Sequence, residues 1–387
     1  MNVVQPIAMP GKPPAATLGL VDVDIHPRTT SLEVFRPYLS QRWWEHLQTW
    51  GMRARHGFTG GQPPFPKAQP LAARRDAWPP TGGTPASDLD FLRFQLLDNY
   101  GIDYGILNPL QPSGQGDRNN GFSAAMAHAN NEWQLDHWLR KEPRLRGSIV
   151  VPYEDPAASA AEIRKRAGDP NFSQVLMMSR TAEPAGNPRY WPIYEAAVEA
   201  GLPVAFHAFG YSGWAMTNGG WPSFYIEEVS EHATSCQNQV ISLVTEGVFA
   251  RYPGLKVVLI ECGFAWLPSV GWRLDKHWKH LKSEVPHLTR LPSDYIKEHI
   301  YVSTQPMEDP ERGKHLLDIC EWVGWDHILF ASDYPHWDFD DPRQALPGTI
   351  PVERRAAIFG GNAKALYNFE TSGGVRDGAP VPAAWER

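Results

Sequence analysis

The sequence predicts an α/β protein in which the 387 residues form a (β/α)8 TIM barrel with long loop insertions after strands 1 and 5. Three observations predict it. Eight short apolar segments recur along the chain, helical patterns lie between them, and the length suits one such barrel with insertions. Strand and helix alternating in this way favour a closed barrel over two doubly wound domains.

The predicted strands are short runs rich in β-branched and other apolar residues. Runs of this kind are typical of parallel strands that are buried on both faces. In chain order they are Leu20–His26, Asp103–Asn108, Arg146–Pro152, Ser173–Ser179, Leu202–His207, Lys256–Cys262, Ile300–Thr304 and Ile328–Asp333.

Helical patterns separate these strands. Several begin with Asp-Pro or Asn-Pro, where the first residue caps the helix and proline occupies its first turn. The predicted helices are Asp88–Tyr100, Asn119–Lys141, Pro156–Ala167, Pro188–Ala200, Glu228–Tyr252, Trp266–Lys282, Pro310–Val323 and Val352–Tyr367.

Two connections are longer than a barrel needs. The first crossover contains Gly51–Ser87, rich in Gly, Pro and Arg, and Gly210–Ile226 follows the fifth strand. Both leave the carboxyl ends of strands, where such barrels carry their active sites. Their aromatic content favours lids over mobile surface loops. We therefore expect an N-terminal extension (1–19), a barrel (20–369) with lid-like insertions at 51–87 and 210–226, and a C-terminal tail (370–387).

Composition excludes several classes of protein. The net charge is −7 at pH 7 and no basic cluster stands out, which argues against a nucleic-acid partner. Three cysteines are too few and too scattered for a disulfide framework or a cysteine-based zinc site. The first residues do not resemble a signal peptide, and no apolar run is long enough to span a membrane. The sequence thus predicts a cytoplasmic protein with no membrane partner.

The first strand carries an unusual pattern, Val21-Asp22-Val23-Asp24-Ile25-His26-Pro27. Because side chains alternate along a strand, Asp22, Asp24 and His26 share one face and the apolar residues share the other. A buried face with an acid and a histidine requires a partner for both. Asp22 lies deeper on this face, and we interpret it as a structural carboxylate or one that supports the site.

The same kind of residue ends two other strands. Asp24 and His26 end the first strand, His207 the fifth and Asp333 the eighth. In a closed barrel these ends converge, and two imidazoles with two carboxylates suit a divalent transition metal. Each residue alone is more often a hydrogen-bonded core histidine or a capping aspartate. All four together favour a metal site.

These residues resemble those of the amidohydrolase superfamily. The likeness is to its amidohydrolase-related branch, which includes aminocarboxymuconate-semialdehyde decarboxylase and the γ-resorcylate and 5-carboxyvanillate decarboxylases. It covers about Leu20 to Phe369 and rests on D-x-H at Asp24–His26, on His207, on SDYPH at Ser332–His336 and on GNAKALY at Gly361–Tyr367. The resemblance implies one divalent metal ion held by Asp24, His26, His207 and Asp333. Asp24 replaces the histidine common in the superfamily, as in the resorcylate-type decarboxylases.

Two departures from the family pattern bear on function. The fourth strand has no lysine at its end, so one metal ion is expected rather than two. The sixth strand has Glu261 where the family usually shows a histidine. A glutamate there accepts a proton or orients a water, or else forms a salt bridge with an arginine such as Arg180. Both interpretations stay open at this point.

Other candidates concern the substrate. Arg180 ends the fourth strand and suits a substrate carboxylate, because a guanidinium matches its geometry. His336 and Asp338 either reach the pocket or fix the loop after Asp333. The last candidates form an aromatic wall in the second insertion, or simply pack that loop: Trp214, Trp221, Phe224 and Tyr225.

The favoured function is a mononuclear metal-dependent decarboxylase, a carbon–carbon lyase that acts on an aromatic or unsaturated carboxylic acid without a redox cofactor. The alternative is a metal-dependent hydrolase of an amide, ester or lactone that uses a metal-activated water. Candidate catalytic residues are Asp333, Glu261 and His207, and the ion is expected to be Zn or Mn. A non-catalytic barrel is a third class, but it has no need for the metal ligands. The family likeness implies a small-molecule substrate and a homodimer or larger homo-oligomer.

Overall fold

The computed structural model describes residues 19–52, 70–208 except 111, 112, 116 and 118, and 220–369 except 221. Eight strands form one parallel sheet in chain order, β1 to β8. Their bounds are β1 Leu20–Ile25, β2 Ile102–Leu107, β3 Leu145–Val150, β4 Phe172–Met178, β5 Val204–His207, β6 Val257–Ile260, β7 Ile300–Ser303 and β8 Ile328–Leu329.

The sheet is closed by the segment that follows β8. The Val23 amide donates to Phe330 O at 3.0 Å, and the His26 amide donates to Tyr334 O at 2.8 Å. Ile25 and Tyr334 form a parallel bridge. The chain therefore forms a (β/α)8 barrel, as the alternating pattern predicts.

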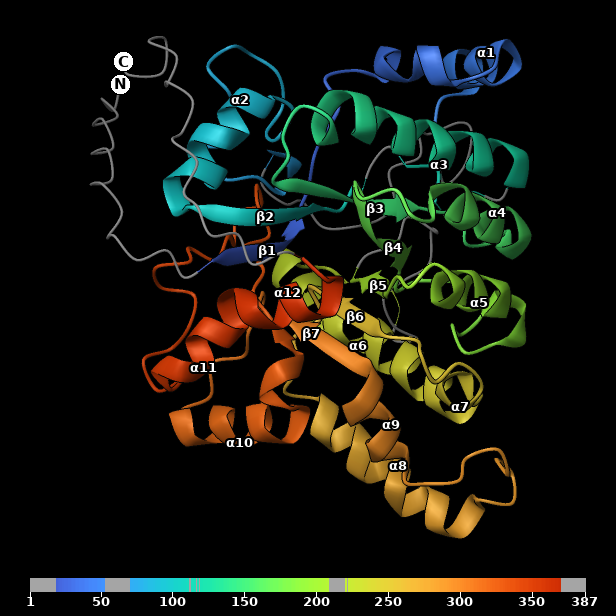
Figure 1. Cartoon of the computed structure of the whole chain (residues 1–387), viewed down its shortest axis with the longest axis vertical. Coiled ribbons are helices and arrows are strands. Elements are labelled where there is room, and N and C mark those ends of the chain that lie inside the picture. Colours follow the sequence, from blue (N-terminus) through green and yellow to red (C-terminus); the bar gives the residue numbers. More distant parts are fainter. Residues whose placement is uncertain are drawn as a thin grey trace.

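Helices surround the strands and follow them in chain order, from α2 and α3 beside β2 and β3 round to α10 and α11 (Figure 1). Their bounds are α1 Gln41–Trp50, α2 Leu89–Leu92, α3 Asn120–Gln134, α4 Pro156–Arg166, α5 Trp191–Glu199, α6 Tyr225–Thr245, α7 Val248–Arg251, α8 Leu267–Leu281, α9 Pro292–His299, α10 Gly313–Val323, α11 Val352–Ala356 and α12 Asn362–Tyr367. Short π turns continue α2, α3 and α11.

The helices differ from the sequence prediction in three places. Helices α1 and α9 are additional, one in the first crossover and one before β7. The single helix expected over Glu228–Tyr252 is two, α6 and α7, because Gly247 lies between them with φ of +75°, where a right-handed helix cannot continue.

The apolar core lies between the strands and the surrounding helices, where side chains such as Val21, Val23 and Ile25 are fully buried. Because strand side chains alternate, Asp22 and Asp24 occupy the opposite face of β1. Both are also fully buried. In the part of the chain that the structure describes, no helix combines the length and apolar character needed to cross a bilayer.

The described end of the first insertion lies against the loop after β8. The Arg74 amide donates to Pro335 O at 2.9 Å, the Trp337 amide donates to Ala72 O at 2.8 Å, and Ala73 bridges His336. Residues 53–69 and most of 210–226 lie outside the described residues, so the predicted lids stay a prediction.

Candidate metal and active site

The carboxyl end of β1 places Asp24 and His26 side by side. His26 Nδ1 donates to the backbone oxygen of Asn108 at 2.9 Å. This bond directs Nε2 to the barrel axis, where it lies 3.2 Å from Asp24 Oδ1. Asn108, just after β2, also donates from its side chain to Asp24 Oδ1 at 2.8 Å. One residue therefore holds both members of the strand-one pair.

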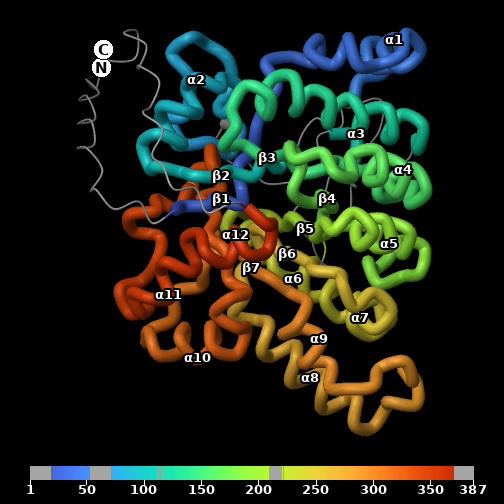
Figure 2. The backbone as a smooth tube through the Cα atoms, in the orientation of Figure 1, coloured from blue at the N-terminus to red at the C-terminus, as the bar shows by residue number. Residues whose placement is uncertain are grey.

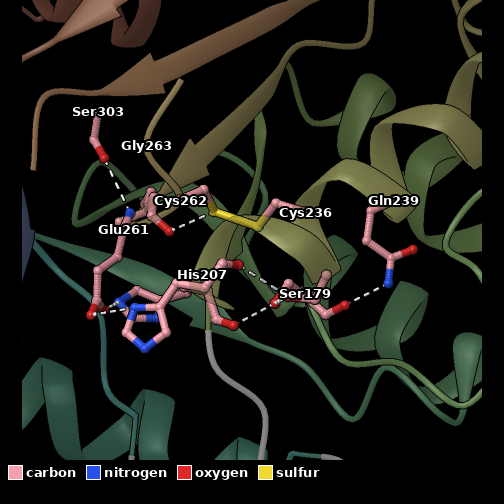
Figure 3. Close-up of a disulfide and its surroundings, with 12 residues drawn as sticks. Ser179, His207, Cys236, Gln239, Glu261, Cys262, Gly263 and Ser303 are labelled. Atoms are coloured by element: carbon pink, nitrogen blue, oxygen red, sulfur yellow. Dashed lines mark hydrogen bonds and ion pairs between the residues drawn. A yellow bond between two sulfur atoms is a disulfide. The ribbon is translucent and has the colours of Figure 1, made fainter. Parts of the chain in front are cut away.

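His207, the last residue of β5, faces the same point. Its Nε2 lies 3.6 Å from Asp24 Oδ2 and 2.9 Å from Glu261 Oε2. Figure 3 shows the carboxylate of Glu261 turned toward the His207 ring. The Glu261 amide donates to Ser303 Oγ at 3.1 Å, which ties this turn to the end of β7.

Asp333 completes the group from the segment after β8. Its Oδ1 accepts hydrogen bonds from His26 Nε2 at 2.9 Å and from His336 Nδ1 at 2.6 Å. The rings of His336 and His26 stack with their centroids 4.6 Å apart. His336 therefore reaches the site, and it also ties the loop to Asp333, so the two interpretations of this residue are compatible.

The backbone conformation after β6 and β8 determines the direction of the Glu261 and Asp333 side chains. Asp333 has φ of +60° and Glu261 has φ of +57°, a left-handed conformation that side-chain-bearing residues adopt mainly where surrounding structure imposes it. Asp22 supplies part of that structure. It accepts from the Ser332 amide at 2.9 Å and the Ser332 hydroxyl at 2.5 Å, which fixes the residue before Asp333. Asp22 thus supports the site, as interpreted from the sequence.

The convergent donors fit a divalent metal ion. Two overlapping groups, each with its ligand-type atoms within 4.8 Å of one another, could hold one: Asp24, His26, His207 and Glu261, and also His26, Glu261, Asp333 and His336. Asp24 Oδ2 is buried and accepts no hydrogen bond from the described residues. Imidazole nitrogen combined with carboxylate oxygen suits zinc, manganese and similar cations.

The pKa values of the two histidines also favour binding of a cation. Burial acts to lower the pKa of His26, but Asp24 and Asp333 outweigh it and hold that pKa well above its usual value. Burial likewise opposes the rise in the pKa of His207 to about 9, which Glu261 and Asp24 cause. The carboxylates thus retain protons on both imidazoles. A cation can replace those protons, because metal binding and protonation compete for the same nitrogen atoms.

Glu261 contacts imidazoles rather than a guanidinium. Besides His207, its carboxylate approaches His232 of α6, with Oε1 3.5 Å from Nδ1. Burial, with Asp333 nearby, raises the pKa of Glu261 to about 8. Among the ion pairs of the described residues none joins Glu261 to Arg180. The contacts of Glu261 among the described residues therefore favour the proton-accepting interpretation over the salt bridge.

Arg180 lies just beyond β4 and is buried, with 5% of its surface exposed. Its charge opposes the burial that raises the pKa of Glu228, on the first turn of α6, to about 6. Arg180 therefore faces the amino-terminal part of α6. Of the expected aromatic wall, Trp214 and Trp221 lie outside the described residues, and Phe224 is 69% exposed. Tyr225 accepts a hydrogen bond from Trp337 Nε1 at 3.0 Å.

The candidate metal cluster consists of Asp24, His26, His207, Glu261, Asp333 and His336. A cavity of about 510 Å³ adjoins this cluster on the side of β7 and β8. Gln305 and Asp338 line it, together with Glu308, Asp309 and Asp340. Gln305 Nε2 donates to Asp338 Oδ2 at 3.1 Å and to Asp333 Oδ2 at 3.3 Å, which links the cavity to the cluster.

Three contributors escaped the sequence analysis: Asn108, His232 and Gln305. Asn108 had a usable signal, because it is a polar residue at the end of the second apolar segment, as His207 is at the end of the fifth. His232 had none, because it lies inside a helix whose rotation about its axis cannot be read from residue spacing alone. Gln305 follows a strand of ordinary composition.

A disulfide bond joins α6 to the turn that carries Glu261. Cys236 lies one helical turn after His232, and Cys262 directly follows Glu261. Figure 3 shows this bond beside Ser179 and Gln239, whose side-chain amide donates to the Ser179 backbone oxygen. The sequence predicts no disulfide framework, because its three cysteines are few and scattered. One pair nevertheless meets, because helix α6 packs against the end of β6, and Cys320 remains a buried free thiol.

Removing this bond is expected to lower stability. The bond closes a loop between residues 26 positions apart, and a cross-link of this span stabilises a fold by roughly 2–4 kcal/mol. Cys236→Ala/Cys262→Ala should therefore lose about that much free energy of unfolding in denaturant titrations without reductant. The difference from the wild-type chain should shrink when both are reduced. Cys320→Ala is the matched control, and an unchanged double variant under oxidising conditions would contradict the expectation.

Comparison with known proteins places this geometry in context. The amidohydrolase family model matches residues 21–369. A γ-resorcylate decarboxylase from Polaromonas sp. strain JS666 is 27% identical over 300 residues, which cover 73% of this chain and 88% of that protein.

Two solved structures show the same fold. A dihydroxybenzoic acid decarboxylase from Polaromonas sp. JS666, with bound manganese and 2-nitroresorcinol, aligns with a TM-score of 0.60 at 22% identity, over 90% of this chain and 97% of its own. An amidohydrolase from Mycobacterium avium subsp. paratuberculosis aligns with a TM-score of 0.69 at 20% identity, over 91% and 100%.

Proposed function

The chain belongs to the amidohydrolase family, and from that premise we propose that it is a metal-dependent decarboxylase of an aromatic or unsaturated carboxylic acid. It needs no redox cofactor for this reaction. One observation carries the proposal: the imidazoles of His26 and His207 and the carboxylates of Asp24 and Asp333 converge at the carboxyl end of the barrel. The curated relatives named γ-resorcylate decarboxylase support the reaction class.

We assign Asp24, His26, His207 and Asp333 as the ligands of one divalent ion. The end of β4 carries Ser179 and Arg180 and offers no lysine to bridge a second ion. Manganese is favoured by its presence in a solved relative, and zinc fits the same donor atoms. When bound, such an ion neutralises negative charge on the substrate carboxylate and on a neighbouring oxygen.

Asp333 is proposed to carry the proton that replaces the departing CO2 on the substrate carbon. Its Oδ1 accepts hydrogen bonds from two imidazoles, whereas its Oδ2 accepts from the side-chain amide of Gln305. The Oδ2 side is therefore the one that can exchange a proton with a substrate. His336 fixes the carboxylate from the same loop.

The substrate is proposed to lie between this carboxylate and Arg180. The buried guanidinium suits an oxygen-bearing group of the substrate, and Trp214 and Trp221 belong to the segment proposed to cover the ring. The segments 51–87 and 210–226 are proposed as lids, because both follow the carboxyl ends of strands and contain aromatic residues. Exclusion of water by such lids strengthens every electrostatic contact inside the site.

Hydrolysis is the second candidate, and Glu261 is the observation that favours it. A buried carboxyl whose pKa is raised to about 8 can act as a general base near neutral pH. In that reaction Glu261 would take a proton from the attacking water, and the substrate would be an amide, ester or lactone.

One experiment separates the two reactions. Purified protein loaded with Mn²⁺ is incubated with 2,6-dihydroxybenzoate, other hydroxylated benzoates and a panel of esters and lactones in ¹⁸O-labelled water. Decarboxylation is expected to release CO2 and leave the organic product without label. Hydrolysis would instead place ¹⁸O in the organic product. Label in the product, with no CO2 from any acid, would overturn the proposal.

The remaining expectations concern assembly, location and metal content. A homodimer or larger homo-oligomer is proposed from the family likeness, and a cytoplasmic location is proposed as the sequence analysis expects. Analytical ultracentrifugation measures the assembly, and cell fractionation measures the location. Elemental analysis is expected to find one equivalent of manganese or zinc per chain, and two equivalents would contradict the ligand assignment.

A further inference from the structure

A chain of polar side chains runs through the interior of the barrel, where barrels of this fold are usually filled by Val, Ile and Leu. Asn108, Ser148 and Gln174 are fully buried, and Tyr367 is nearly so. A buried polar group destabilises a fold unless it is hydrogen-bonded. Each of these four side chains forms a hydrogen bond with another of the four, so together they form one connected network.

The hydrogen bonds lead step by step to Asp24. Tyr367 Oη donates to Gln174 Oε1 at 2.8 Å. Gln174 Nε2 donates to Asn108 Oδ1 at 3.1 Å and to Ser148 Oγ at 3.0 Å. Ser148 Oγ donates to Asn108 Oδ1 at 2.6 Å. Asn108 Nδ2 finally donates to Asp24 Oδ1 at 2.8 Å.

The direction of these bonds is determined by the groups at the Asp24 end. Asn108 Nδ2 also lies 3.0 Å from the backbone oxygen of Val23, which can only accept. The amide nitrogen of Asn108 must therefore point this way, and its oxygen must point toward Gln174. The Gln174 amide is oriented in turn, and its own oxygen is left to accept from the Tyr367 hydroxyl.

Tyr367 is the last residue of α12 and belongs to the opposite end of the barrel. On the same helix, the Asn362 side chain donates to the backbone oxygen of Ile328, the first residue of β8. Gln174 lies near the start of β4, whereas Asn108 lies beyond the end of β2. Figure 2 shows α12 beside β1, and this helix also contacts β8. The polar chain thus connects helix α12, at the opposite end of the barrel, with the candidate metal cluster.

We propose that Asn108 is a positioning residue for Asp24 and that Tyr367 acts through Gln174 and Asn108 on the same carboxylate. Helix α12 then sets the affinity of the site for its metal ion from the far end of the barrel. A donor held against Asp24 Oδ1 fixes the carboxylate and leaves Oδ2 directed at the cluster. The inference rests on the proposed role of Asp24 as a metal ligand.

The Asn108→Ala variant isolates the side chain. The backbone oxygen that accepts from His26 Nδ1 remains, so the variant removes the support of Asp24 and leaves that of His26. Titration of metal-free protein with Mn²⁺ alone is expected to show binding weakened about ten- to hundredfold, the usual effect of losing a partner of a metal ligand. Tyr367→Phe is expected to weaken binding in the same direction by a smaller factor, because it acts through two amides.

A matched control distinguishes positioning from general loss of stability. Tyr194 Oη is also buried and donates to the backbone oxygen of Ala185, away from the polar chain. Tyr194→Phe therefore removes a similar hydroxyl and should leave Mn²⁺ affinity unchanged. In the Asn108→Ala background, Tyr367→Phe should have no further effect on affinity, because the route to Asp24 is already broken.

Two outcomes would overturn the inference. The first is that Tyr367→Phe binds Mn²⁺ with wild-type affinity. The second is that Tyr367→Phe and Tyr194→Phe lose equal amounts of Mn²⁺ affinity and that these losses add in the double variant. Asp24→Ala in the same titration tests the premise separately. If Asp24→Ala binds Mn²⁺ as the wild-type chain does, the ligand assignment fails, and the inference fails with it. If Asp24→Ala loses Mn²⁺ while Tyr367→Phe keeps it, only the inference fails.

Discussion

Asp333→Asn is expected to keep the fold and part of the bound metal while turnover falls by roughly a hundredfold to ten-thousandfold, the range for loss of a general acid–base group. Asparagine retains an oxygen where Asp333 Oδ1 accepts from His26 and His336. The new amide nitrogen faces Gln305, whose Oε1 accepts no hydrogen bond among the described residues and can turn to receive it. The asparagine side chain therefore keeps the shape of Asp333 and an oxygen that can bind the metal ion, but it can no longer carry a proton.

Turnover is measured on protein whose Mn²⁺ content has been determined, so that lost metal is not mistaken for lost chemistry. Asp275→Asn is the control, because Asp275 lies on α8 and accepts hydrogen bonds from Ser293, away from the cluster. It should retain wild-type turnover. Near-normal turnover of metal-loaded Asp333→Asn would remove Asp333 from the reaction.

The fold was predictable because its strands obey a simple constraint. A parallel strand covered on both faces must be an apolar run, so β3, β4 and β5 were located to within one or two residues. The eighth strand was predicted as Ile328–Asp333 but spans only two residues, because the chain leaves the ladder to close against β1. Helix α9 is absent from the sequence prediction because it has only 8 residues and lies in a polar stretch.

The candidate site was predictable where it depends on strands and unpredictable where it depends on helix packing. Alternation fixes which face of β1 carries Asp24 and His26, and parallel strands bring their ends together with His207. The approach of His232 to Glu261 depends on how α6 packs against the end of β6. The pairing of Cys236 with Cys262 depends on the same packing, and residue spacing contains no information about it.

His207→Ala is expected to lower metal content and activity together. The imidazole is fully buried, and its Nε2 lies within 3.6 Å of Asp24 Oδ2 and 2.9 Å of Glu261 Oε2. Its removal leaves three proposed ligands. The carboxylates of Asp24 and Glu261 also lose the imidazole beside them, which is either protonated or bound to the metal ion. Affinity for Mn²⁺ should fall by more than the roughly hundredfold that loss of a supporting partner causes, because the ligand itself is gone.

His299→Ala provides the matched control for this variant. His299 is also a buried histidine, but it precedes β7 and its Nδ1 donates to the backbone oxygen of Leu255, at the opposite end of the barrel. Both variants lose a buried ring, so both should unfold more easily. Only His207→Ala should emerge from a metal-free gel-filtration column with its manganese or zinc depleted. Wild-type metal content in His207→Ala would show that the ion is held elsewhere. Equal depletion in His299→Ala would show that the metal is lost through destabilisation, which both variants share, and not through loss of a ligand.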